Sequence, residues 1–203
     1  MMKQLFATAV ALSAAFVLAA PAAATAVVGQ PAPAFTATDS NGRTISLADF
    51  KGKPVVLEWT NADCPFVQKY YSGGDMQKLQ ADARKQGAVW LTINSGAPGK
   101  QGHQSGSAAN AKMRSQGFQS TAYLLDADGA VGRAYGARTT PHMFVIAPDG
   151  TLAYAGGIDS IASANPADIA RAEPLTRLAI TQVAAGKPVA TPTSRPYGCS
   201  VKY

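Results

Sequence analysis

The chain has 203 residues, which is enough for one domain with a sizeable hydrophobic core. Its 18 basic and 12 acidic residues give a net charge of +6, but the basic residues are scattered and do not alternate with aromatic ones, which excludes a nucleic-acid footprint. The two cysteines, Cys64 and Cys199, permit a single bridge and therefore exclude a disulfide scaffold.

The N-terminus predicts a secretory signal peptide over residues 1–26. Lys3 is followed by an apolar run at residues 5–20, and Ala24-Thr25-Ala26 offers the small residues that a signal peptidase needs. The apolar run is short for a membrane span, although an uncleaved anchor is the open alternative. We therefore expect a periplasmic or secreted single domain over residues 27–203, with no membrane association after cleavage.

The first half of this domain predicts a hairpin, a strand and a helix. Asn-Gly within Ser40-Asn41-Gly42 separates two alternating segments, which is a hairpin signal. The β-rich apolar run VVLEWT at residues 55–60 predicts a central buried strand. A helix is expected over residues 64–86 with an interruption at residues 72–75, and Pro65 suits its first position because a missing N–H costs nothing there.

The second half predicts further alternation and a closing helix. Expected strands cover residues 88–94 and 122–126, a hairpin joins HMFVIA to TLAYAG, helices cover residues 108–116, 129–135 and 166–185, and a loop and a tail without period cover residues 95–106 and 187–203. This order predicts an α/β sandwich with a mixed sheet. Because chemistry gathers at the carboxyl ends of strands in such sheets, Cys64 stands at a favourable place.

The motifs in this order resemble the thioredoxin-like superfamily. The opening VGQPAPAFTATDSNGRTISLADFKGKPVVLEW is similar to its redoxin branch, which contains peroxiredoxins of the AhpC/TSA type and exported thiol–disulfide oxidoreductases. WTNADCPF, TTP and RPYGCSVKY follow, and the last is similar to a bacterial peroxiredoxin-like subgroup. The resemblance covers residues 28–203. It implies a thioredoxin-like three-layer sandwich, with a central mixed β-sheet flanked by helices and an N-terminal β-hairpin extension.

The resemblance also implies a site, because the family fold places a reactive cysteine at a helix N-terminus opposite a cis-proline. By position, Cys64 corresponds to the attacking cysteine of a Cys-x-x-Cys motif, while Val67 stands where the second cysteine would be. Pro141, preceded by Thr140, corresponds to the cis-proline and would support the backbone of a substrate.

Peroxiredoxins place a threonine three residues before their cysteine, where this chain has Asn61, with Thr60 one residue earlier. Their peroxide-binding arginine usually stands where this chain has Thr140-Pro141, and the nearby Arg138 cannot be equated with it. The substrate-binding residues implied by the resemblance are thus Thr60, Asn61, Thr140 and Pro141.

Cys64 can attack a peroxide or a disulfide only as a thiolate. Unpaired N–H groups and the dipole at a helix N-terminus favour that anion, while the neighbouring Asp63 opposes it unless its carboxylate faces solvent. We expect a moderately lowered pKa for Cys64. The alternative is a buried, inert cysteine.

After the attack, a second thiol has to resolve the intermediate, and Cys199 is the other thiol in the chain. Gly198 would free the backbone so that the tail swings toward Cys64. Two alternatives stay open for Cys199: a permanent bridge that ties the tail to the domain, and a bond between chains.

Four further side chains near these motifs have open roles. Trp59 is expected in the core rather than as a substrate platform, and Glu58 is either a buried acid–base group or solvent-facing. His103 and His142, the two histidines, would be needed with Cys64 for a copper or zinc site. We therefore predict no metal site in this protein.

We therefore expect an exported thiol-dependent oxidoreductase with an antioxidant or thiol–disulfide exchange role. It would reduce a hydroperoxide or a protein disulfide with electrons from an external thiol reductant, and without a bound cofactor. The alternative is a metal-binding or partner-binding thioredoxin-fold module without turnover, in which Cys64 and Cys199 form a structural disulfide. The sequence does not indicate the substrate, the electron donor or the oligomeric state.

Overall fold

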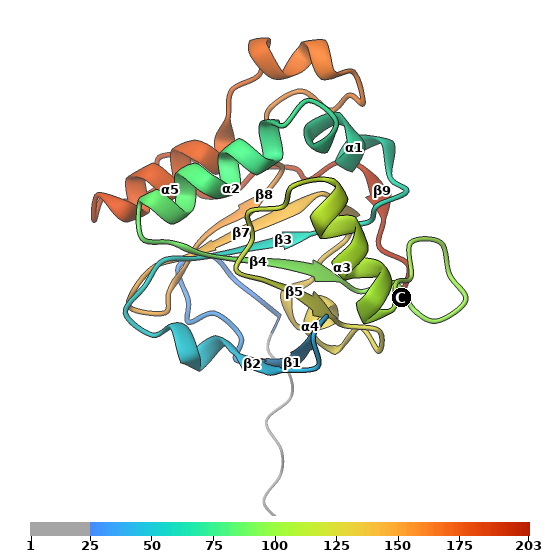
Figure 1. Cartoon of the computed structure of the whole chain (residues 1–203). Coiled ribbons are helices and arrows are strands. Elements are labelled where there is room, and N and C mark those ends of the chain that lie inside the picture. Colours follow the sequence, from blue (N-terminus) through green and yellow to red (C-terminus); the bar gives the residue numbers. More distant parts are fainter. Residues whose placement is uncertain (1–24) are drawn as a thin grey trace, which may run out of the picture.

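The computed structural model describes residues 25–203 (Figure 1). The predicted signal peptide, residues 1–26, lies outside the described residues except for its last two. No helix within residues 25–203 is long and apolar enough to cross a membrane.

A seven-stranded sheet forms the centre of the domain, in the order β2-β1-β5-β4-β3-β7-β8 (Figure 1). The strands are β1 (Thr36–Asp39), β2 (Thr44–Ser46), β3 (Val55–Trp59), β4 (Val89–Asn94), β5 (Ala122–Leu125), β7 (His142–Ile146) and β8 (Leu152–Gly156). Strands β3, β4 and β5 are parallel, whereas β7, β8 and the β1–β2 hairpin are antiparallel to their neighbours. The predicted mixed sheet is confirmed, and β3 is an inner strand whose five residues are all buried.

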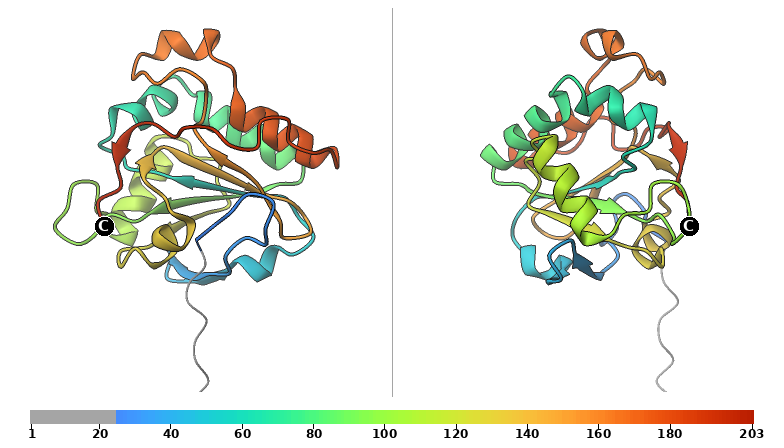
Figure 2. Two further views of the ribbon diagram at one scale, coloured as in Figure 1. Left: turned by 180° about the vertical axis from the view of Figure 1, so that it is seen from behind. Right: turned by 45° about the vertical axis from the view of Figure 1, so that its right-hand side comes forward.

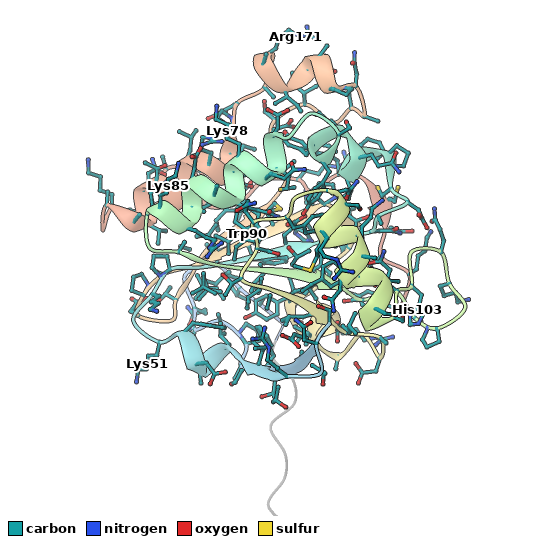
Figure 3. The ribbon with its side chains drawn as sticks, viewed as in Figure 1. Lys51, Lys78, Lys85, Trp90, His103 and Arg171 are labelled. Atoms are coloured by element: carbon teal, nitrogen blue, oxygen red, sulfur yellow. The ribbon has the colours of Figure 1, made fainter. Side chains whose placement is uncertain are left out.

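Helices cover both faces of the sheet and complete three layers (Figures 1 and 2). They are α1 (Pro65–Tyr71), α2 (Asp75–Lys85), α3 (Gly106–Ser115), α4 (Ala130–Tyr135), α5 (Leu175–Ala184) and the 3-10 helices η1 (Leu47–Phe50) and η2 (Pro166–Arg171). One core packs between the sheet and α1, α2 and α5, and includes Trp90, labelled in Figure 3. A second core lies on the opposite face, beneath α4 and the N-terminal segment.

The predicted elements mostly match, with one clear correction. The expected interruption at residues 72–75 separates α1 from α2. The expected single helix over residues 166–185 is wrong, because η2 ends at Arg171 and α5 begins only after Pro174. Proline lacks an N–H donor and disfavours helical geometry in the residue before it, so the helix cannot continue through this position.

The tail after α5 is the second departure from the expectation. It runs back across the molecule, as the red segment in Figure 2 shows. Near its end β9 (Cys199–Ser200) pairs antiparallel with β6 (Thr139–Thr140) in a separate two-stranded sheet. The pattern of the sequence predicted neither strand.

A buried ion pair anchors this tail to α1. Lys69 Nζ lies 2.9 Å from Asp159 Oδ2, and both side chains are almost completely inaccessible to solvent. The hydroxyls of Tyr70 and of Tyr197 in the tail also donate to this carboxylate. Because the charges are paired and hydrogen-bonded, the cluster is tolerated in the interior and fixes the tail two residues before Cys199.

We expect Asp159→Ala to lower the free energy of unfolding by about 3–5 kcal/mol, because it leaves the Lys69 ammonium buried without a partner. The double variant Lys69→Met/Asp159→Ala should recover most of this loss, since it removes both charges. Urea unfolding of the wild type, the two single variants and the double variant provides the measurement. Strictly additive losses would contradict the coupling.

Candidate functional site

Cys64 lies at the junction between β3 and α1, as the N-cap residue of the helix, with Pro65 in the first helical position. The turn before it is shaped by Asn61. The backbone O of Asn61 accepts from Cys64 N at 3.0 Å, and its side-chain Oδ1 accepts from Asp63 N at 2.9 Å. Asp63, the residue before Cys64, is exposed, so solvent screens its carboxylate and weakens its opposition to a thiolate at Cys64.

Three predicted residues meet above this helix start. The peptide bond between Thr140 and Pro141 is cis, and as a thiol Cys64 donates through Sγ to Thr140 O at 3.1 Å. Thr140 is also the direct partner of Cys199 in the β6–β9 pair. The fold thus brings Cys64, the Thr140-Pro141 strand and Cys199 together, and both cysteines are thiols in the structure.

The tail is already docked at this site, whereas the sequence analysis expected it to swing in. Gly198 has φ +133°, and a Cβ at this position would lie 2.0 Å from Thr140 O. Only glycine can approach the Thr140 carbonyl this closely. Gly198 therefore allows Cys199 to lie next to the Thr140 carbonyl.

The surroundings of the two thiols lower the pKa of Cys64 and raise the pKa of Cys199. Burial of the Cys64 sulfur raises its pKa, whereas hydrogen bonds to its thiolate, above all from the Cys199 thiol, lower it and prevail. N–H groups of Cys199 and Val67 contribute to this effect. Burial and the neighbouring Cys64 sulfur raise the pKa of Cys199 to about 12. Cys64 is the group that ionises, and Cys199 is the proton donor.

Glu58 lies inside the domain beneath α1. The solvent-facing alternative for this residue is wrong, because its side chain is fully buried. Burial raises the pKa of the carboxyl, although four hydrogen bonds oppose that rise. The donors are Tyr71, Gln80, Trp90 and Thr92. The raised pKa favours the protonated form of this carboxyl, which lies six residues before Cys64 in the sequence.

Thr60 and Asn61 are both buried at the foot of the site. Together with Thr140 and residues 201–202 of the tail they line a cavity of about 10 Å³, which has room for roughly one water molecule. The Asn61 amide packs against Gly102, where a Cβ would lie 2.3 Å from it. The substrate-binding role of Thr60 and Asn61 stays a prediction. In the structure the Asn61 amide donates to Gln101 O at 3.5 Å and so joins the Cys64 turn to the loop at residues 95–105, whereas the Thr60 N–H donates to Ile93 O in β4 at 2.9 Å.

Trp59 is a core residue, as expected, and packs edge-on against Phe144 with ring centroids 5.1 Å apart. The two histidines do not join Cys64 in a metal site. His142 is buried, and its Nδ1 accepts from Arg138 N at 3.3 Å. His103 lies exposed on the loop at the right of Figure 3. Within residues 25–203 no group of three His, Cys, Asp or Glu side chains could hold a metal ion.

The sequence analysis missed the residues that hold the tail on both sides of Cys199. Tyr197 binds the buried Asp159 cluster, and the Tyr203 hydroxyl donates to Ala137 O at 2.7 Å. The Tyr203 ring also stacks under Arg133, whose guanidinium carbon lies 4.7 Å from the ring centroid. The sequence signal for this anchoring was the pair of tyrosines, Tyr197 and Tyr203, that flanks Cys199 in RPYGCSVKY.

Comparison with known proteins places this site in a family. The profile of the AhpC/TSA family matches residues 28–155. The chain belongs to the AhpC/TSA family. The matched region contains Cys64, Thr140 and Pro141, whereas Cys199 lies beyond it.

This AhpC/TSA protein is also similar to individual proteins. A curated relative, the thiol-disulfide oxidoreductase ResA of Bacillus subtilis, is 31% identical over 124 residues, which are 61% of this chain and 64% of ResA. The chain thus spans less than two thirds of the length of that relative. A hypothetical protein from Sinorhizobium meliloti has a solved structure with 26% identity and a TM-score of 0.73, covering 88% of this chain and 96% of that one.

A third neighbour confirms the thioredoxin-like fold alone. The thioredoxin domain of a thiol-disulfide oxidoreductase from Bacteroides vulgatus is 21% identical and superposes with a TM-score of 0.50, over 63% of this chain and 86% of that one. The predicted three-layer sandwich is confirmed.

Removal of the Cys199 thiol should raise the pKa of Cys64, because the main hydrogen-bond donor to its thiolate is lost. We expect Cys199→Ala to raise the pKa of Cys64, as followed through the ultraviolet absorbance of the thiolate during a pH titration. Cys199→Ser is the matched control, since its hydroxyl still donates. An equal rise in both variants would contradict this assignment.

His142 should make stability depend on pH. Burial, aided by Arg138, lowers its pKa from 6.5 to about 3, so the folded state resists a proton that the unfolded state accepts. The stabilisation is complete above the unfolded pKa and is lost as pH falls toward the folded pKa. Between about pH 7 and about pH 5 the wild type should lose about 2 kcal/mol more than His142→Asn. Urea unfolding at both pH values measures this difference, and equal losses would contradict it.

Proposed function

We propose that this protein is an exported thiol-dependent oxidoreductase in which Cys64 attacks the substrate and Cys199 resolves the intermediate. The observation that carries the proposal is the register of β6 and β9, which places Cys199 opposite Thr140, the residue whose carbonyl Cys64 contacts. The lowered pKa of Cys64 and the raised pKa of Cys199 support the same assignment of roles.

The same two cysteines can reduce either of the substrate classes that the sequence predicts, a hydroperoxide or a protein disulfide. With a hydroperoxide, the Cys64 thiolate takes one oxygen and releases an alcohol, or water in the case of hydrogen peroxide. The Cys199 thiol then condenses with the sulfenic acid and releases one water. With a protein disulfide, Cys64 forms a mixed disulfide and releases one thiolate, and Cys199 displaces the other. Both routes end in a Cys64–Cys199 disulfide, which an external thiol reductant returns to two thiols.

The proposed location is the periplasm or the outside of the cell. The predicted signal peptide supports it, because disulfide chemistry persists outside the cytosol. The antioxidant role follows for a hydroperoxide substrate, and the thiol–disulfide exchange role for a protein disulfide.

Mass spectrometry after one equivalent of hydrogen peroxide tests this proposal on the reduced protein without residues 1–26. The wild type should lose two hydrogens and yield a Cys64–Cys199 peptide pair, whereas Cys199→Ser should carry a sulfenic acid on Cys64 that dimedone traps. Cys64→Ser is the control, and its Cys199 should form neither an intrachain disulfide nor a dimedone adduct. Dithiothreitol should sustain turnover in the wild type and not in Cys64→Ser.

The full burial of Cys64 favours one competing function, a permanent staple between tail and domain. In that case the disulfide would form, but no oxidant would be consumed beyond one equivalent. The reductant would then lower Tm by several degrees without supporting turnover.

A further inference from the structure

The backbone edge beside Cys64 is occupied by the protein's own tail. Thr139 pairs with Ser200 and Thr140 pairs with Cys199. The Val201 N–H extends this ladder, since it donates to Arg138 O at 3.0 Å. An unpaired strand edge is a template for an extended segment of another chain. In this protein the strand edge next to the Cys64 sulfur is already paired with residues of the tail.

Two anchors hold this occupant at both of its ends. Before Cys199, Tyr197 donates to Asp159 and also accepts from Lys69 Nζ at 3.3 Å. After Cys199, the ring of Tyr203 lies in a socket where Gly129 and Gly132 leave room. A Cβ at either glycine would lie within 2.5 Å of the Tyr203 ring or hydroxyl.

The loop at residues 95–105 adds a further contact to the C-terminal end of the tail. The Ala97 N–H donates to Lys202 O at 2.8 Å. The strand β9 itself is only two residues long, so it opens by breaking few hydrogen bonds while the anchors on either side stay in place.

We propose that the docked tail, residues 196–203, is a tethered occupant of the substrate-strand position, which makes the enzyme selective for small oxidants over extended protein disulfides. This inference rests on the proposed role of Cys64 as the attacking thiol. The specificity-determining residues are Gly198, which permits the close approach to Thr140, and the anchors Tyr197 and Tyr203.

The physical basis is competition between a tethered and a free strand. A tethered segment acts at an effective concentration in the millimolar range, so a peptide at micromolar concentration competes poorly for the same edge. A small oxidant does not need that edge. It requires only a local opening at Cys199, which leaves the two tyrosine anchors bound.

The test compares two probes with the same reactive group and different size. The small probe is N-acetylcysteine that carries one nitrothiobenzoate group in a disulfide, and the large probe is an extended peptide whose cysteine carries the same group in the same linkage. In both reactions the Cys64 thiolate forms a mixed disulfide and the coloured aryl thiolate leaves, so the rates are read in the same way. All variants carry Cys199→Ser, which removes the second thiol and retains the tail.

In the Cys199→Ser parent we expect the small probe to react at least about tenfold faster than the peptide, as a tethered competitor requires. Adding Gly198→Ala should abolish most of this preference by raising the peptide rate, because the new Cβ would meet Thr140 O. Adding Ser200→Ala is the matched control, since its exposed side chain lies on the same strand, and should leave the ratio unchanged. Tyr203→Ala replaces Gly198→Ala if the latter does not fold.

Three results would overturn the proposal. A ratio near one in the parent would show that the docked tail excludes nothing. An unchanged ratio after Gly198→Ala and Tyr203→Ala would show that the tail does not set it. An equal rise of the rates of both probes after these substitutions would show that the tail limits access to Cys64 without selecting by substrate size. If no variant reacts with either probe while Cys64 is alkylated after unfolding, the proposed function itself fails and this inference with it.

Discussion

The pairing of β9 with β6 is the contact on which the site depends. Cys64 is positioned locally, by the turn at Asn61 and the start of α1, but a single buried thiol has no partner of its own there. The pairing supplies that partner from the far end of the chain, in register with the carbonyl that already contacts Cys64. Without it, the main hydrogen bond that lowers the pKa of Cys64 would be absent.

Much of the fold was predictable because its elements carry their own signals. The run VVLEWT, the Asn-Gly hairpin and Pro65 after Cys64 each have a local physical meaning. The short strands β6 and β9 were not predictable, since two residues cannot show a period and their pairing joins positions 59 residues apart. Cys64 and Pro141 could therefore be placed from the sequence, whereas the docked position of Cys199 could not.

Lys69 illustrates a second limit. A lysine in a short helix normally faces solvent, and no pattern around it indicates burial. Its ammonium is buried because Asp159, a loop residue after β8, pairs with it, and because Tyr197 closes the cluster from the tail. A buried charge of this kind is favourable only when all partners are present together. The cluster is therefore a property of the assembled tertiary structure rather than of any one segment.

The difference between the pKa values of the two thiols would also give the proposed catalytic cycle a direction. In a Cys64–Cys199 disulfide, the thiol with the lower pKa is the better leaving group, which here is Cys64. In the proposed cycle an external reductant would therefore attack the sulfur of Cys199, which is also the more accessible of the two, and expel the Cys64 thiolate. That thiolate is the form needed for the next attack. The N–H groups of Cys199 and Val67, which are present at every stage of the proposed cycle, stabilise the Cys64 thiolate when it is released.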